Sequence, residues 1–73
     1  MAQKPTVREL RERAGLQIRE LAIASGVSEA SINRMERKGS PVGVVLVNKI
    51  LRVINDRLGT DYEAHEVDVM LLQ

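Results

Sequence analysis

Five residues between positions 28 and 34 carry side chains that can read the edges of nucleic-acid bases. A guanidinium group can bond to O6 and N7 of one guanine together, and a carboxylate can accept from the amino group of cytosine. A carboxamide can pair with adenine, and a methyl group can pack on the thymine methyl. We therefore assign candidate contacts with DNA bases to Ser28, Glu29, Ala30, Asn33 and Arg34.

Each of these residues also has a simpler role open to it. Arg34 can be solvated or bound to a phosphate, and Glu29 can be a first-turn carboxylate that interacts favourably with the helix dipole. Ser28 suits a helix N-cap that also donates to a phosphate. Ala30 can merely permit close approach, and Asn33 can point too far to the side. The residue types alone leave both sets of roles open.

The charge of the chain is distributed unevenly. Residues 1–40 contain eight Lys or Arg and five Asp or Glu, a net charge of +3, whereas residues 41–73 contain three and five, a net charge of −2. A polyanion should therefore meet the N-terminal part, unless these are ordinary solvated charges. The candidate contacts with DNA phosphates, each with plain solvation as its alternative, are Gln17, Arg19, Arg37, Lys38 and Ser40.

The composition offers little for catalysis or metal binding. There is no cysteine, and the single histidine, His65, lacks a second histidine or thiol for a typical zinc site. No glycine-rich phosphate loop, serine elbow or paired-carboxylate cleft is visible, so we expect no enzyme activity, no metal and no cofactor. The longest apolar run, 44–47, is far too short to span a membrane. The absence of cysteine fits a reducing cytoplasm, where we expect the protein.

The spacing of apolar residues predicts four helices that position these side chains. Thr6 with Glu9 three residues later forms a capping-box pattern, and Ser28 is a favourable N-cap, whereas Gln17 is a poor one. Glycines that can end a helix follow the apolar stretches at Gly15, Gly26, Gly39 and Gly59. The expected helices begin at Thr6, cover about 18–25, cover about 28–38, and run from Pro41 or Gly43 to Leu58.

The second and third of these helices are separated by only three residues, 26–28. A connection this short forces the helices to cross steeply, with Ala22 small at their approach and Val27 filling the angle. This is the geometry of a helix-turn-helix, in which the outer face of the later helix enters the major groove of DNA. The expected core is Leu10, Leu21, Ala22, Val27, Ile32, Met35, Val47, Ile50, Leu51 and Ile54.

The chain divides into a DNA-binding domain, 1–58, and an acidic C-terminal tail, 59–73. The tail can form a fifth helix within 63–72, although its Val-Asp-Val alternation also suits an edge strand. Its apolar residues exceed what one small core needs, as do Val44, Val45 and Val53 on the fourth helix. They therefore either form a symmetric dimer interface or fold back within the monomer.

Four segments carry a resemblance to a known family: LRERAGL (10–16), ELA (20–22), SGVSEASINRME (25–36) and NKI (48–50). Over roughly 6–58, the chain resembles the phage-repressor-type (Cro/repressor, xenobiotic-response-element) helix-turn-helix DNA-binding family. The resemblance implies an all-α, lambda-repressor-like domain of four to five short helices, of bacterial or phage origin and associated with the nucleoid. It also implies a homodimer on double-stranded DNA, and a structural ion pair between Arg11 and Glu36.

The chain departs from the family pattern in three places. The second helix starts with Gln17-Ile18 where the family has Ser-Gln, so a DNA contact is either missing or moved to Gln17 or Arg19. The loop RKGSPVG is one residue longer than the common form, and the acidic tail has no fixed template in the family.

Three functions remain open from the sequence. The first is a sequence-specific transcriptional regulator, a repressor by this resemblance, that reads the major groove with its third helix. The second is an antitoxin that uses the same domain and binds a protein partner through its C-terminal segment. The third is a protein–protein interaction module that has lost DNA binding, which the missing glutamine at Ile18 favours.

Overall fold

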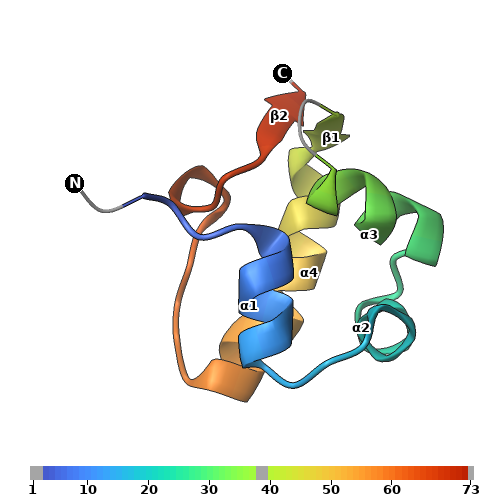
Figure 1. Cartoon of the computed structure of the whole chain (residues 1–73), viewed down its shortest axis with the longest axis vertical. Coiled ribbons are helices and arrows are strands. Elements are labelled where there is room, and N and C mark those ends of the chain that lie inside the picture. Colours follow the sequence, from blue (N-terminus) through green and yellow to red (C-terminus); the bar gives the residue numbers. More distant parts are fainter. Residues whose placement is uncertain (1–2, 38–39, 73) are drawn as a thin grey trace.

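In the part of the chain that the structure describes, four α-helices pack around one apolar core, and residues 41–43 and 70–72 meet in a small sheet (Figure 1). The computed structural model describes residues 3–37 and 40–72. The prediction of four helices is confirmed. The elements are α1 (Val7–Arg13), α2 (Ile18–Ser25), α3 (Glu29–Glu36), β1 (Pro41–Gly43), α4 (Val44–Leu58), the 3-10 turn η1 (Ala64–Glu66) and β2 (Met70–Leu72).

Local hydrogen bonds set the beginnings of the first three helices. The backbone N–H of Glu9 donates to Thr6 Oγ1 at 3.0 Å, and Glu9 Oε1 accepts from the backbone N–H of Thr6 at 3.4 Å, so the predicted capping box is confirmed. Ser28 Oγ accepts from the backbone N–H of Ser31 at 3.1 Å, which confirms the cap of α3. The Gln17 side chain makes no capping bond to α2.

Glycines end the helices where the sequence predicts. Gly15, Gly26 and Gly59 all have positive φ, whereas Gly39 lies outside the described residues. At Gly26, φ is 75° and the backbone N–H donates to the carbonyl of Ala22 at 2.9 Å. A side chain at this position would strain the left-handed conformation that starts the turn into α3.

Two helix boundaries differ from the prediction. α3 ends at Glu36 rather than near residue 38, and Arg37 is already extended. α4 begins at Val44 after Gly43, so the alternative start at Pro41 was wrong. Residues 41–43 instead form β1, because they pair with a strand far along the chain.

The core brings together residues from every helix and from the tail. The predicted core is confirmed at nine positions, and Ala22 is partly buried beside it. The turn residue Val27 is buried, as its place in the helix crossing requires. The sequence reasoning missed four buried residues outside the helix stripes: Leu16, Val42, Ala64 and Val67.

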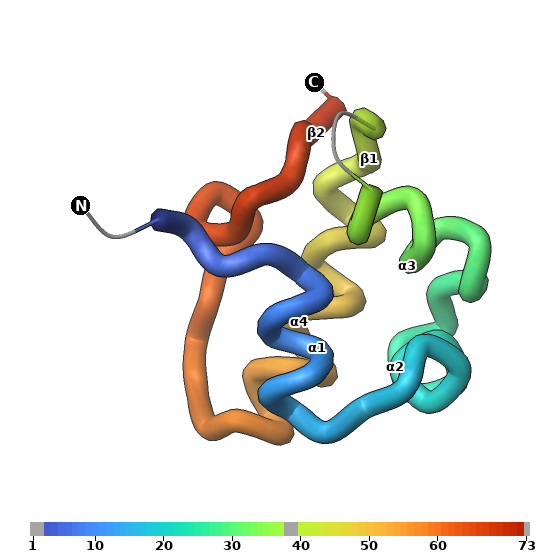
Figure 2. Tube along the Cα trace, in the orientation of Figure 1, coloured from blue at the N-terminus to red at the C-terminus, as the bar shows by residue number. Residues whose placement is uncertain are grey.

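The tail returns along the molecule to the end where β1 lies (Figure 2). β2 runs parallel to β1, with Val42 opposite Leu71. Among the described residues of the tail there is a 3-10 turn but no fifth α-helix, and the strand lies at 70–72, directly after the Val-Asp-Val segment that suggested one. Burial along the tail alternates, since Val67 is buried and Val69 partly buried while Asp68 and Met70 between and after them are exposed. That period of two suits a strand and not a helix.

Asn55 on α4 fastens the chain that leaves the helix. Its Oδ1 accepts from the backbone N–H of Tyr62 at 2.9 Å and from Thr60 Oγ1 at 2.9 Å. Its Nδ2 donates to the carbonyl of Tyr62 at 2.9 Å. Further along, the backbone N–H of Asp68 donates to the carbonyl of Pro5 at 2.8 Å. The tail is thus hydrogen-bonded both to α4, through Asn55, and to the segment before α1, through Pro5.

Asn55→Ala should lower the free energy of unfolding by about 1–2 kcal/mol, because it leaves two partly buried backbone groups of Tyr62 without their partner. Asn48→Ala is the matched control on the same helix, since Asn48 is exposed. Urea unfolding followed by circular dichroism measures both. Equal effects of the two substitutions would contradict the anchoring role of Asn55.

Candidate nucleic-acid interface

The candidate interface is built on the turn between α2 and α3. After Gly26, the buried side chain of Val27 sits in the angle between the helices, and its backbone N–H donates to Ser25 Oγ at 3.2 Å. Ser28 then caps α3. Because each residue of this turn has a packing or hydrogen-bonding partner, the direction of α3 relative to α2 is well determined.

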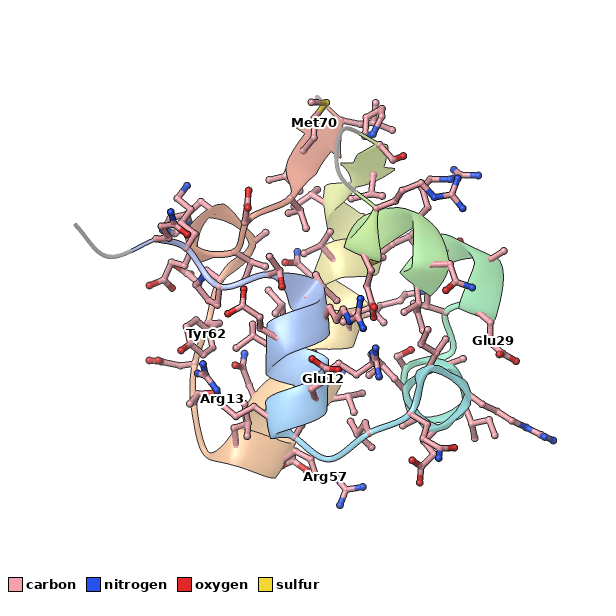
Figure 3. All side chains as sticks on the ribbon, in the orientation of Figure 1. Glu12, Arg13, Glu29, Arg57, Tyr62 and Met70 are labelled. Atoms are coloured by element: carbon pink, nitrogen blue, oxygen red, sulfur yellow. The ribbon has the colours of Figure 1, made fainter. Side chains whose placement is uncertain are left out.

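The two faces of α3 differ in kind. Ile32 and Met35 are buried and hold the inner face against the core. The structure places all five candidate base-contacting residues together on the exposed side, and Figure 3 shows Glu29 projecting away from the molecule. These exposed residues are Ser28, Glu29, Ala30, Asn33 and Arg34.

Ser28 is more engaged than its sequence position suggests. Besides accepting from the backbone N–H of Ser31, its hydroxyl donates to Ser31 Oγ at 3.0 Å. In this arrangement the Ser28 hydroxyl proton is not free to be donated to a phosphate. The remaining lone pair of Ser28 Oγ can only accept a hydrogen bond, for example from a base amino group. The partner hydroxyl of Ser31 follows from the S-x-x-S spacing, which the sequence reasoning did not use.

The candidate phosphate contacts are spread over three segments. Gln17 and Arg19 are exposed at the beginning of α2, Arg37 is exposed just after α3, and Ser40 is half-buried before β1. Lys38 lies outside the described residues. These positions flank the exposed side of α3 in sequence, as expected for groups that position a helix on the DNA backbone.

The beginning of α2 is already occupied by a carboxylate. Glu20 Oε1 accepts from the backbone N–H of Gln17 at 2.9 Å. A helix N-terminus can bind a phosphate through its free N–H groups, but here one such group is taken and a negative charge stands beside it. Ile18 is half-buried against the core and offers no hydrogen bond. The exposed side chains of Gln17 and Arg19 are available for a phosphate contact at this end besides the remaining N–H groups.

A nearly buried ion pair ties α3 to α1. Arg11 Nε donates to Glu36 Oε2 at 2.7 Å and Arg11 Nη2 donates to Glu36 Oε1 at 3.1 Å. The side chains are 12% and 10% exposed. Arg11 Nη1 also donates to the carbonyl of Leu16 at 3.0 Å, which joins the loop before α2 to the same group. The hydrogen bond to Glu36 raises the pKa of Arg11 more than burial lowers it, so the guanidinium is charged whenever the domain is folded.

One group of metal-ligating side chains occurs among the described residues, away from α3. Ligand atoms of Glu63, His65 and Glu66 lie within 4.8 Å of one another, and all three residues are exposed. Glu66 Oε1 also accepts from the backbone N–H of Glu63 at 3.0 Å, so this carboxylate already closes the turn of η1. Their closeness is explained by the turn.

Comparison with known proteins identifies the family of the chain. A family model described as a helix-turn-helix domain matches residues 6–61. The chain belongs to the helix-turn-helix domain family. A search of curated proteins and a search of solved structures gave no match. The match to this helix-turn-helix domain includes α1 to α4 and the first residues after α4.

Membership confirms the all-α helix-turn-helix fold expected from the sequence. The helix-turn-helix domain is a fold of DNA-binding regulators and is generally not enzymatic. Among the described residues, no helix of this helix-turn-helix domain is long and apolar enough to cross a membrane. The parallel pair β1 and β2 is an addition of only three residues each to the helical fold.

Proposed function

We propose that this domain is a sequence-specific, double-stranded DNA-binding transcriptional regulator of the repressor type. The exposed face of α3 supports the proposal, because a helix fixed by Ile32 and Met35 on one side presents base-reading side chains on the other. In this proposal α3 enters the major groove of a promoter in the cytoplasm. The bound protein then either blocks access of the transcription machinery to the promoter or recruits it.

Within this proposal, the side chains of α3 have distinct roles. Arg34 bonds to a guanine, Glu29 accepts from a cytosine amine, and Ala30 packs on a thymine methyl. Asn33 bonds to an adenine, and Ser28 Oγ accepts a hydrogen bond from a base amino group in addition to its capping bonds. The side chains that bind phosphates are Gln17, Arg19, Arg37, Lys38 and Ser40.

Selection of bound sites from a random double-stranded DNA library tests this function. We expect one enriched motif whose half-sites are about 10 base pairs apart, as required by two recognition helices on one face of DNA. If the bound DNA contained no enriched motif, the domain would not recognise a specific sequence. A salt-independent absence of binding to random DNA would support the protein–protein module instead, because phosphate contacts make DNA binding strongly dependent on salt.

Arg34→Ala and Arg37→Ala remove the same charge from the same end of the domain and should have different effects. Arg34→Ala should weaken binding to the selected site by about 1–3 kcal/mol and relax base choice at one position. Arg37→Ala should weaken all sequences alike and reduce the salt slope by about one. Titrations of the selected site and of a scrambled site at several salt concentrations measure this. If both variants bound DNA as the wild type does, α3 would not be the helix that contacts the bases.

We further propose that the domain acts on DNA as a homodimer.

A second candidate function is that of an antitoxin that binds a protein through its C-terminal segment. That alternative is supported by the exposed side chains of Met70 and Leu72 next to the exposed acid Asp68. A toxin gene adjacent to this one, whose product copurifies with the chain, would favour the antitoxin.

A further inference from the structure

Ser28 and Ser31 form a pair of hydroxyl groups at the beginning of α3. Ser28 Oγ accepts from the backbone N–H of Ser31 at 3.1 Å, and the Ser28 proton is donated to Ser31 Oγ at 3.0 Å. A serine hydroxyl has one proton and two lone pairs, so Ser28 Oγ keeps one lone pair for a further partner. Ser31 Oγ keeps one lone pair and its proton, because it donates to no other group within residues 3–37 and 40–72.

The two hydroxyls lie on different parts of the surface of α3. Ser28 is exposed at the end of the helix, whereas Ser31 is half-buried. The neighbours of Ser31 one turn later are the exposed Arg34 and the buried Met35, so Ser31 lies at the border between the outer and the inner face. A helix about 10–12 Å across nearly fills a major groove about 12 Å wide. In such a groove the border of the exposed face lies beside the phosphates that form its walls.

We propose that Ser31 donates its proton to a DNA phosphate and thereby fixes which bases Ser28 can bind. The inference rests on the proposed entry of α3 into the major groove. An oxygen of a backbone phosphate has no proton and can only accept, so Ser31 must donate to it. The lone pairs of Ser31 Oγ then hold the Ser28 proton, and only the lone pair of Ser28 Oγ faces the base. Ser31 is thus a positioning residue that sets base choice without touching a base.

A hydroxyl that can only accept distinguishes two bases from the other two. Adenine N6 and cytosine N4 carry amino groups that donate in the major groove, whereas guanine O6 and N7 and thymine O4 only accept. On the strand that it faces, Ser28 therefore favours adenine or cytosine. A serine hydroxyl without such a neighbour rotates to suit its partner and can bind any of the four bases. The selectivity therefore comes from the bond between Ser28 and Ser31, and the chain from base to phosphate strengthens each of its bonds by mutual polarisation.

Base choice at the position that Ser28 contacts tests the inference. Selection of sites with Ser28→Ala identifies this position as the one whose preference changes. Four duplexes that differ only at that base pair are then titrated with the full chain. The wild type should bind adenine and cytosine about three to ten times more tightly than guanine and thymine. Ser31→Ala should weaken binding and bring the four affinities within about twofold of one another. Ser31→Thr keeps the hydroxyl and should keep the preference.

The base preference at the position that Arg34 contacts is the internal control and should be the same in the wild type and in Ser31→Ala. Alanine favours a helix, and Ser28 keeps its bond to the backbone N–H of residue 31, so the variant should fold, which circular dichroism checks. A preference for guanine or thymine at the Ser28 position overturns the inference and leaves the proposed function intact. So does a wild-type preference in Ser31→Ala, or a Ser28→Ala variant that selects the wild-type motif. If the wild type enriched no motif at all, the proposed function and this inference would both be wrong.

Discussion

Ile32→Ala should lower the free energy of unfolding by about 2–5 kcal/mol, the largest effect that we expect from a single substitution. Ile32 is fully buried and holds the inner face of α3 on the core. The substitution leaves a cavity that a domain of this size can scarcely tolerate, because total stabilities are about 5–15 kcal/mol. Urea unfolding followed by circular dichroism measures the loss.

The control for this experiment is another isoleucine in the same helix pair. Ile23 lies on α2 and is 74% exposed, so Ile23→Ala should change the stability by no more than about 0.5 kcal/mol. If the two substitutions had equal effects, the inward orientation of Ile32 and the outward orientation of the α3 reading face would both be wrong.

Glu36→Gln should destabilise the fold by about 3 kcal/mol, because it leaves the nearly buried guanidinium of Arg11 without its counterion. The loss exceeds that of a solvent-exposed pair because water cannot readily replace the carboxylate beside an Arg11 side chain that is only 12% exposed. Arg11 keeps its bond to the carbonyl of Leu16, which limits the effect. The same unfolding measurement applies, with DNA affinity as a second readout of the position of α3.

The chain offers a matched exposed pair for comparison. Arg8 Nε and Glu12 Oε2 are 3.7 Å apart, and these side chains are 67% and 58% exposed. Glu12→Gln should therefore cost only about 0–1 kcal/mol. A double-mutant cycle with Arg11→Met isolates the coupling of the buried pair. A coupling as small as that of the exposed pair would show that Arg11 and Glu36 are neighbours without a stabilising role.

Local chemistry made the helices predictable. Thr6 and Ser28 begin helices through bonds to residues three positions later, and Gly26 and Gly59 end them through a left-handed backbone. These interactions depend on a few consecutive residues, so the sequence contains them in readable form. The inward position of Ile32 follows from the same helical spacing.

The strands were harder to predict because their partners are distant. Pro41 pairs with Met70, and no local pattern identifies a parallel partner so far along the chain. Val42 is buried where β1 contacts α3, α4 and the returning strand β2. The Val-Asp-Val alternation suited an edge strand as well as a fifth helix, because three residues are too few to decide between them by periodicity.

The candidate site was predictable in its composition and less so in its local bonds. The exposure of Asn33 and Arg34 follows from the helical period once Ile32 and Met35 face the core. By contrast, Gln17 was judged a poor cap, and the bond from its N–H to Glu20 was missed because only the reverse half of a capping box is present. The known preference for Ser, Thr, Asp and Asn at the N-cap concerns the bond that the N-cap side chain accepts. It says nothing of the bond from the N-cap backbone N–H to a carboxylate three residues later.

The return of the tail has a consequence for the order in which the chain assembles. The turn between α2 and α3 joins neighbours in sequence, whereas the bond from Asp68 to Pro5 and the pairing of β2 with β1 close long loops. The entropic cost of closure rises with loop length, and distant pairings slow folding. We expect α2 and α3 to meet early and the tail to dock last, so that β2 joins β1 only after the exposed face of α3 has formed.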